Sequence, residues 1–208
     1  MKILGIVGSP RERDDSFILV EKTLQAAKKE KSSLQTEIIQ FSKQKIKSCK
    51  GCKSCADEPY ICIQQDDLNK VYQSMKKADG IILACPGYGP FGACPSIMQA
   101  FLERLINLNY LPSKRNQKSV FPLKDKPCGL IVVSIEGEES NLPVLRSLEQ
   151  YVLAYKMKPI QIKNPPFLGI SGKEDETGET LNDKQAMENA KFLGKTMAKA
   201  ISPQLRLA

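Results

Sequence analysis

Four of the seven cysteines stand close together in the chain, at Cys49, Cys52, Cys55 and Cys62. Their spacing is C-x2-C-x2-C-x6-C, and in a reducing compartment such a group indicates a metal site rather than disulfides. Short gaps let three thiolates converge on a [4Fe–4S] cubane, and the longer gap brings the fourth thiolate from the other side. Zinc is the alternative metal, since four thiolates also satisfy a tetrahedral ion, and redox-active thiols are a further alternative. The overlapping C-x2-C steps favour the iron–sulfur cluster, because zinc sites more often use two separated pairs.

A second group of residues has the composition of a phosphate site. Gly8-Ser9-Pro10-Arg11 follows an apolar run, and Ser16 stands where an amphipathic stretch begins. Backbone N–H groups at a helix N-terminus, hydroxyl side chains and an Arg together bind a phosphate dianion. The Gly-Lys-Ser/Thr ending of a Walker loop is absent. The plainer interpretation is a strand-to-helix turn in which Asp15 or Ser16 caps the helix.

Two further loops have the composition of a site for a flat ring. The segment 85–92 contains two Pro, three Gly and two aromatic residues, so it is irregular yet stiff. The segment 134–140 is small and polar. One phosphate loop and two ring loops predict a mononucleotide flavin, and no Gly-x-Gly-x-x-Gly fingerprint indicates a second nucleotide half. We therefore expect FMN rather than FAD.

Short apolar runs alternate with amphipathic stretches along the whole chain, which is typical of repeated βαβ units. This periodicity predicts strands at 2–8, 34–41, 79–85, 128–134 and 159–163, and helices at 16–30, 66–77, 95–108, 140–156 and 182–201. In such a sheet, ligands bind at the carboxyl ends of the strands, where the three loops lie. We expect a single α/β domain over 1–208, with a Cys-rich insertion at 47–65 after the second strand.

Composition limits the classes of function. The chain has 208 residues, a formal charge of +8 and ordinary globular proportions of apolar and charged residues. No apolar run approaches the ~20 residues of a membrane span, and the N-terminus lacks a signal-peptide pattern. The lysines are spread along the chain without a nucleic-acid motif, which favours a solvated surface. We expect a cytoplasmic protein that binds neither nucleic acid nor membrane.

Several of these segments, taken in order, resemble the NADPH-dependent FMN reductase family over residues 1 to about 155. They are the Gly8–Arg11 loop, Asp66-Asp67-Leu68, Ala78–Ile82, and the Pro86-x-Tyr88 loop with Phe101-Leu102-Glu103-Arg104 after it. The cysteine pattern is similar to that of the iron–sulfur flavoprotein branch. The resemblance implies a flavodoxin-like, doubly wound five-stranded parallel sheet of order 2-1-3-4-5, with helices on both faces and FMN bound. It implies phosphate ligands at Ser9, Arg11 and Ser16, a ribityl and ring lining from Pro86, Tyr88 and Gly89, and an approach to the ring by Gly137 and Glu138.

This chain departs from the family pattern at two places. Asp15-Ser16 replaces the usual Asn-Thr, and an Asp beside a phosphate repels it unless the side chain points away or caps the helix. The loop from Gly87 to Cys94 is longer than usual. Of the remaining cysteines, Cys94 stands near an expected helix N-terminus, which would lower its pKa, and Cys85 and Cys128 are expected to be buried.

The function expected from these observations is electron transfer between a two-electron donor and a one-electron partner, by FMN and a [4Fe–4S] cluster without a catalytic side chain. NAD(P)H is a possible donor. The partner would be a redox protein or a small electron acceptor, and the relatives imply a homo-dimer or homo-tetramer. The alternatives are an NAD(P)H-dependent FMN or quinone reductase without a cluster, and a non-catalytic module that senses redox state.

Overall fold

The computed structural model describes residues 1–56, 62–89, 92–105, 122–163, 166–174 and 176–201. The helices lie close to the predicted positions; the last predicted residues of the 95–108 helix, 106–108, lie outside the described residues. The α-helices are α1 (Asp15–Glu30), α2 (Leu68–Lys77), α3 (Ser96–Arg104), α5 (Glu138–Ala154) and α6 (Lys184–Ala200), and the 3-10 helices are η1 (Phe41–Lys43), η2 (Ser54–Ala56) and η3 (Glu179–Leu181). The strands are β1 (Lys2–Val7), β2 (Gln35–Gln40), β3 (Gly80–Pro86), β4 (Pro127–Ser134), β5 (Lys158–Pro159), β6 (Ile162–Lys163), β7 (Pro166–Phe167) and β8 (Ile170–Lys173).

The main sheet is parallel and has the strand order β2-β1-β3-β4-β5. Gly5 of β1 pairs with Ile38 on one side and with Ile82 on the other. Every residue of β3 and β4 is buried, as expected for strands covered on both faces. The predicted fold class and strand order are therefore confirmed.

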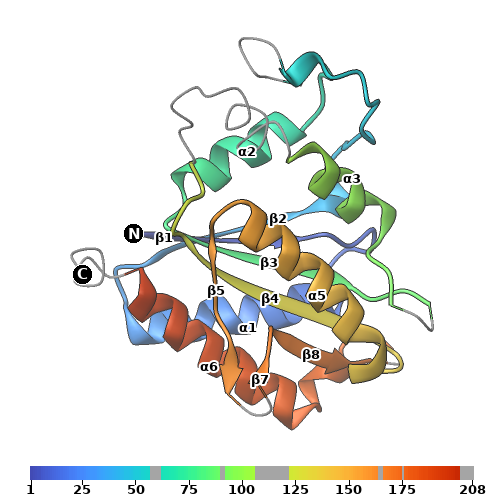
Figure 1. Ribbon diagram of the computed structural model, residues 1–208. Coiled ribbons are helices and arrows are strands. Elements are labelled where there is room, and N and C mark those ends of the chain that lie inside the picture. The colour runs from blue at the N-terminus through green and yellow to red at the C-terminus, as the bar shows by residue number, and fades with distance from the viewer. Residues whose placement is uncertain (57–61, 90–91, 106–121, 164–165, 175, 202–208) are drawn as a thin grey trace.

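Helices cover both faces of the sheet, with α2, α3 and α5 on one face and α1 and α6 on the other (Figure 1). Alternate side chains of a strand point to opposite faces. In β1, Leu4 packs in the core under the first group of helices, whereas Ile3 packs in the core under the second. Gly194 lets α6 approach α1 closely, because a Cβ at this position would lie 2.2 Å from the carbonyl oxygen of Thr23.

The far edge of the sheet differs from the prediction. The strand expected at 159–163 is split: β5 pairs with the start of β4, whereas β6 pairs antiparallel with β7, away from the main sheet. β8, which the sequence analysis missed, then pairs with the end of β4, with Ile170 opposite Ile131. Prolines cannot donate ladder hydrogen bonds, and the chain rejoins β4 only after the prolines at 165 and 166.

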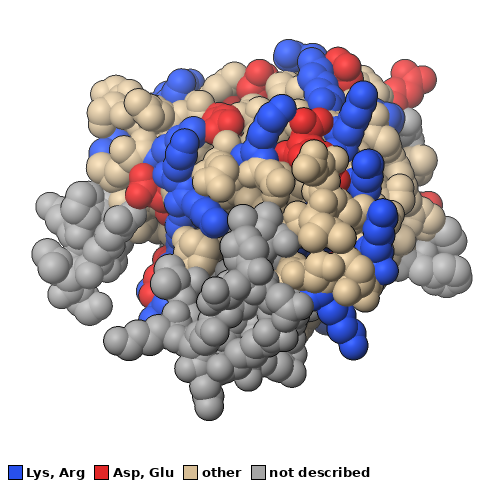
Figure 2. Space-filling model, turned by 90° about the horizontal axis from the view of Figure 1, so that it is seen from above, with Lys and Arg blue, Asp and Glu red and all other residues tan. Residues whose placement is uncertain are grey.

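Charged side chains of both signs lie on the face of the molecule that Figure 2 shows. In Figure 2, Lys and Arg side chains are spread over the face that is shown, with acidic side chains between them. Within the described residues, every helix is too short or too polar to cross a membrane.

Candidate functional site

The first loop delivers its side chains to the N-terminus of α1. Asp14 caps this helix by accepting a hydrogen bond from the N–H of Phe17 (3.0 Å), so the prediction that Asp15 or Ser16 is the cap is wrong. Ser9 is buried, and its Oγ accepts a hydrogen bond from the N–H of Arg11 (3.1 Å). Ser16 is also buried, and its Oγ has no hydrogen-bond partner in the part of the chain that the structure describes.

Arg11 and Asp15 are both engaged with a segment far along the chain. An Nη2 of Arg11 lies 2.5 Å from Oε1 of Glu174, the residue that follows β8. The carboxylate of Asp15 accepts hydrogen bonds from the N–H groups of Gly178 (2.8 Å) and Thr180 (2.9 Å) and from the Thr180 hydroxyl. Asp15 therefore points toward η3, which satisfies the condition under which an acidic residue is tolerated beside a phosphate site.

The two acidic groups share this network unequally. Burial raises the pKa of Asp15, but hydrogen bonds with Glu174, Thr180 and Gly178 outweigh it, and the pKa is lowered. The pKa of Glu174 is raised to about 7, first by burial and then by its hydrogen bond with Asp15, against the lowering effect of Arg11. Asp15 is therefore the charged member of the pair, and Glu174 titrates near neutral pH.

The second loop leaves the carboxyl end of β3 as a small hairpin. Pro86 ends the strand, and Tyr88 and Ala93 form an antiparallel bridge with two hydrogen bonds of 2.9 Å. Gly89 has a φ of +70°, and a Cβ there would meet nothing within 4 Å. Its carbonyl accepts a hydrogen bond from the Ser140 hydroxyl (2.9 Å). The second loop is thus fastened to the start of α5.

The third loop completes the same edge of the sheet. Gly137, with a φ of +72°, precedes α5 and donates its N–H to Oγ of Ser134 (3.1 Å). Glu138 is exposed, and so is Ile135, with 57% of its surface accessible. Tyr88 is 41% exposed, and burial raises its pKa while Arg11 lowers it, which places the phenol within electrostatic reach of the first loop.

These loops have free groups that fit FMN at both ends. At the phosphate end, the Oγ of Ser16, which has no partner among the described residues, lies at the positive end of α1. At the ring end, Gly89 leaves open space beside the exposed Tyr88. Asn141, in the first turn of α5, holds a buried Oδ1 without a partner among the described residues, 3.1 Å from where a Cβ of Gly87 would stand. Ser9, Arg11, Ser16, Pro86, Tyr88, Gly89, Gly137 and Glu138 all lie at this edge, and their roles as ligands remain predictions.

Sequence reasoning missed Glu174, Ile135 and Asn141. The signal for Glu174 was the short run before it at 170–173, which reads as a strand once the prolines at 165 and 166 are taken as an interruption. Ile135 was visible as an apolar residue in an otherwise polar loop. Nothing near Asn141 in the sequence distinguishes it from an ordinary helix residue.

The four clustered cysteines lie on the segment between η1 and α2. All four are free; Cys49 and Cys52 are exposed, and Cys55 and Cys62 are half-buried. The pKa of Cys55 is raised by burial and then by the other three thiols, so the group shares one electrostatic neighbourhood. Within the described residues, no three Cys, Asp or Glu side chains are placed to hold one ion. The donor set therefore fits a four-thiolate metal group in number, type and neighbourhood, but the sulfur atoms are not closed around a centre.

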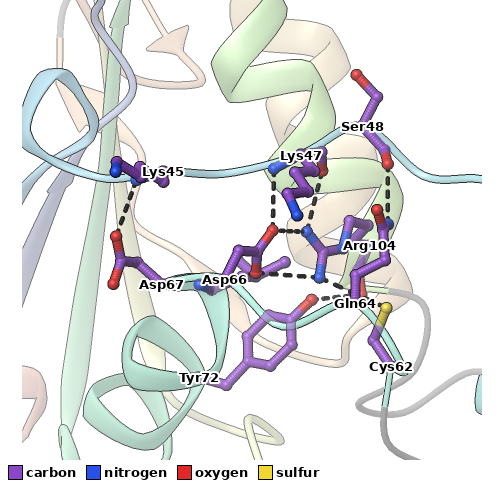
Figure 3. A network of polar contacts seen from close by, with 10 residues as sticks. Lys45, Lys47, Ser48, Cys62, Gln64, Asp66, Asp67, Tyr72 and Arg104 are labelled. Carbon is purple, nitrogen blue, oxygen red and sulfur yellow. Dashed lines mark hydrogen bonds and ion pairs between the residues drawn. The ribbon is translucent and has the colours of Figure 1, made fainter.

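A polar network joins the two ends of this segment (Figure 3). Oδ2 of Asp66 accepts a hydrogen bond from the N–H of Lys47 (2.9 Å), and Oδ2 of Asp67 accepts one from the N–H of Lys45 (2.9 Å). The side-chain amide of Gln64 donates to the carbonyl of Ser48 (2.9 Å). These hydrogen bonds join residues 45–48, before the cysteines, to residues 64–67, after them, and we call this group of contacts the neck of the cysteine segment.

The remaining cysteines are buried or half-buried, and the pKa of Cys94 is lowered for a different reason from the one expected. Cys85 and Cys128 are buried, and Cys94 is half-buried. The pKa of Cys94 is lowered, as predicted, but mainly by a hydrogen bond with the thiol of Cys85. The Cys85–Cys94 contact closes the base of the second loop.

Known proteins with related sequences and structures point the same way. The profile of the NADPH-dependent FMN reductase family matches residues 1–163. An iron-sulfur flavoprotein of Methanocaldococcus jannaschii is 28% identical over 202 residues, which cover 97% of each chain. One of Methanosarcina thermophila is 28% identical over 193 residues and 93% of each chain. Among solved structures, RosB with a bound 8-demethyl-8-formylriboflavin-5'-phosphate intermediate has a TM-score of 0.70 at 18% identity, over 100% of this chain and 81% of RosB. That structural likeness shows a common fold.

Proposed function

The chain belongs to the NADPH-dependent FMN reductase family, and on that premise we propose that it is an FMN-containing electron-transfer protein with a [4Fe–4S] cluster. Family membership makes it an FMN-dependent oxidoreductase. The observation that carries the proposal is the set of four free thiols on one segment, in one electrostatic neighbourhood, presented through a closed neck beside the flavodoxin-like sheet. The two relatives that are named iron-sulfur flavoproteins support it.

The first loop would hold the phosphate of FMN. Ser16 offers a buried hydroxyl that otherwise lacks a partner in the described structure, and the N–H groups at the start of α1 add their positive dipole end. Arg11 would pair with the phosphate after leaving Glu174, or share its fork between the two anions. Because the Asp15 carboxylate points toward η3, its negative charge would face away from the phosphate of FMN.

The second and third loops would hold the ring. Tyr88 presents an exposed aromatic side chain, and the neighbouring Gly89 has open space where a Cβ would stand. Gly137, which precedes α5, would approach the ring from the third loop. Ile135 would cover apolar ring surface and exclude water from it. Bound FMN supplies both two-electron and one-electron chemistry, because flavin is stable in three oxidation states.

Cys49, Cys52, Cys55 and Cys62 would hold the cluster, which supplies one-electron transfer. The exposure of Cys49 and Cys52 leaves one side of the segment open to a redox partner. NAD(P)H is the donor that fits the family, a redox protein or small acceptor is the partner, and a homo-dimer or homo-tetramer is the assembly. In this scheme the chain binds, orients and shields the redox groups, and its side chains form no covalent intermediate.

The test starts with anaerobic purification, an absorption spectrum, and analysis of iron, zinc and sulfide. Heating and chromatography then identify the released flavin, which we expect to be FMN; recovery of FAD would contradict the single phosphate loop. Serine is nearly isosteric with cysteine but a poor ligand for soft metals. Serine at any of the four positions should abolish iron binding while FMN stays near stoichiometric and is still reduced by a chemical two-electron reductant. Wild-type protein without iron, or Ser variants with unchanged transfer to one-electron acceptors, would refute the cluster.

A second candidate function is an NAD(P)H-dependent FMN or quinone reductase without a cluster. The observation that favours it is that the cysteine side chains are not arranged around one ion within the described residues. The three loops at the carboxyl edge of the sheet hold their positions by contacts that do not involve the four clustered cysteines, such as the hydrogen bond from Ser140 to Gly89. Steady oxidation of NADPH by a quinone or free FMN, at equal rates in wild type and Cys52→Ser, would establish it.

A further inference from the structure

Arg104, the last residue of α3, is an unusual residue to find in a core. It is only 2% exposed, and its guanidinium pairs with both carboxylate oxygens of Asp66, whose side chain is equally buried. The same guanidinium donates to the carbonyl of Lys47 (3.0 Å) and to Sγ of Cys62 (3.4 Å). Figure 3 shows the Arg104 side chain between Asp66 and Cys62, with the backbone of Lys47 beside it.

The partners of Arg104 stand on both ends of that segment. Lys47 precedes the first cysteine by two residues, and Asp66 follows the last by four. Arg104 itself is held by its backbone, because its carbonyl accepts a hydrogen bond from the Tyr72 hydroxyl of α2 (2.5 Å). The side chain of Arg104 thus contacts Lys47 before the cysteines, Asp66 after them, and the sulfur of Cys62.

We infer that Arg104 is the positioning residue of the cysteine site: it fixes Cys62 relative to the fold and donates an N–H to the sulfur of the fourth metal ligand. The inference rests on the proposed metal-binding role of the cysteines. It requires only a thiolate-held metal, however, and so can be tested apart from electron transfer.

An ion pair with Asp66 alone does not account for this arrangement. Burying two charges is costly, and a well-packed apolar pair of similar volume is often as stable. The planar fork of Arg allows two N–H groups to serve the carboxylate while others reach the Lys47 carbonyl and the sulfur. When Cys62 binds a metal as a thiolate, its bond from Arg104 becomes charge-assisted and holds the ligand in place.

Two measurable consequences follow. Contacts of this kind behind a ligand typically change metal affinity by about 10–100-fold when they are removed. Hydrogen bonds and positive charge at cluster sulfurs also favour the reduced, more negative state, so they raise the reduction potential. Arg104→Lys keeps the charge but loses the fork, so it should lower both affinity and potential.

The experiment compares Arg104→Lys with a control at the same neck. Asp67→Ala removes the contact to the N–H of Lys45 without touching Cys62. In the reduced, metal-free protein, titration with Co²⁺ alone is followed by thiolate-to-cobalt absorption. We expect affinity to fall about 10–100-fold in Arg104→Lys and to stay at the wild-type value in Asp67→Ala. After reconstitution with iron and sulfide, the potential should fall by about 59 mV in Arg104→Lys, a tenfold change for a one-electron couple, and not in the control.

The outcomes separate the possibilities. Equal losses in both variants would mean that Arg104 only closes the neck, and unchanged Arg104→Lys values would mean that its bond to sulfur has no effect; either result overturns the inference. If Arg104→Lys does not fold, the double variant Arg104→Met with Asp66→Leu decides, because an apolar pair of similar volume is often as stable as a buried ion pair and leaves the net charge unchanged. Its Co²⁺ affinity should fall about 10–100-fold relative to Asp67→Ala, and an affinity equal to that of the control overturns the inference. If Co²⁺ affinity falls in Arg104→Lys but the wild type never assembles an iron–sulfur cluster, the proposed electron-transfer function is refuted while the inference stands.

Discussion

Glu174 should make FMN binding depend on pH. Its carboxylate is 2.5 Å from Arg11, the cation predicted to meet the phosphate, so the two anions compete for one guanidinium. The pKa of Glu174 is raised to about 7 by burial and by Asp15. The neutral carboxyl is therefore the main form below pH 7 and is lost as the pH rises above 7. We expect strong FMN binding on the acid side and weaker binding on the alkaline side.

The magnitude follows from the protonated fraction. With a pKa of about 7, that fraction is about 0.9 at pH 6 and about 0.1 at pH 8. If Arg11 turns to the phosphate when Glu174 is neutral, the apparent Kd is divided by this fraction and rises about tenfold between the two pH values. The phosphate's own second ionisation, near pH 6, acts in the opposite direction because it increases the ligand's charge.

Glu174→Gln separates the two effects, since the amide imitates the neutral carboxyl at every pH. The assay is quenching of flavin fluorescence on binding to the apoprotein from pH 6 to pH 8, with riboflavin as a ligand that lacks the phosphate. Between pH 6 and pH 8 the FMN affinity of the wild type should fall about tenfold relative to that of the variant, whereas neither protein should lose affinity for riboflavin. An equal loss in Glu174→Gln, or the same loss for riboflavin, would refute the competition for Arg11.

Three further perturbations test the first and second loops. Arg11→Ala should weaken FMN binding about tenfold. This is the lower end for a charge-assisted contact, because the guanidinium must first leave the carboxylate of Glu174. Equal weakening of riboflavin binding would show that Arg11 does not contact the phosphate. Asp15→Ala leaves the N–H groups of Gly178 and Thr180 without an acceptor and should lower the free energy of unfolding, measured by urea denaturation, by about 1–3 kcal/mol. An unchanged urea midpoint would show that these hydrogen bonds do not stabilise the fold. Gly92→Ala should lower the free energy of unfolding by about 1–3 kcal/mol, since its Cβ would lie 1.9 Å from the carbonyl oxygen of Ser140. Gly178→Ala is the control, because its Cβ would meet no atom within 4 Å and the variant reports the cost of a positive φ alone. Equal losses of stability in the two variants would show that the close contact at Gly92 relaxes freely.

The sequence by itself determined the features whose signals lie in neighbouring residues. Alternating apolar and amphipathic stretches predicted the sheet and its helices, because a strand buried on both faces must be nearly continuous in apolar residues, as β3 and β4 are. The glycines and prolines after β3 predicted an irregular loop for the same local reason. The cysteine spacing indicated a four-thiolate segment, and the structure places its thiols in one neighbourhood.

Only the tertiary structure decided the contacts between distant residues. Arg11 meets Glu174 across 163 positions, and Arg104 meets Cys62 across 42. Asp14, and not Asp15, caps α1, while the Asp15 carboxylate accepts hydrogen bonds from the distant residues Gly178 and Thr180. Nothing in the residues beside Glu174 or Arg104 distinguishes a surface charge from a buried one. That difference arises because packing brings separate segments together and leaves a buried charge only the partners that those segments supply.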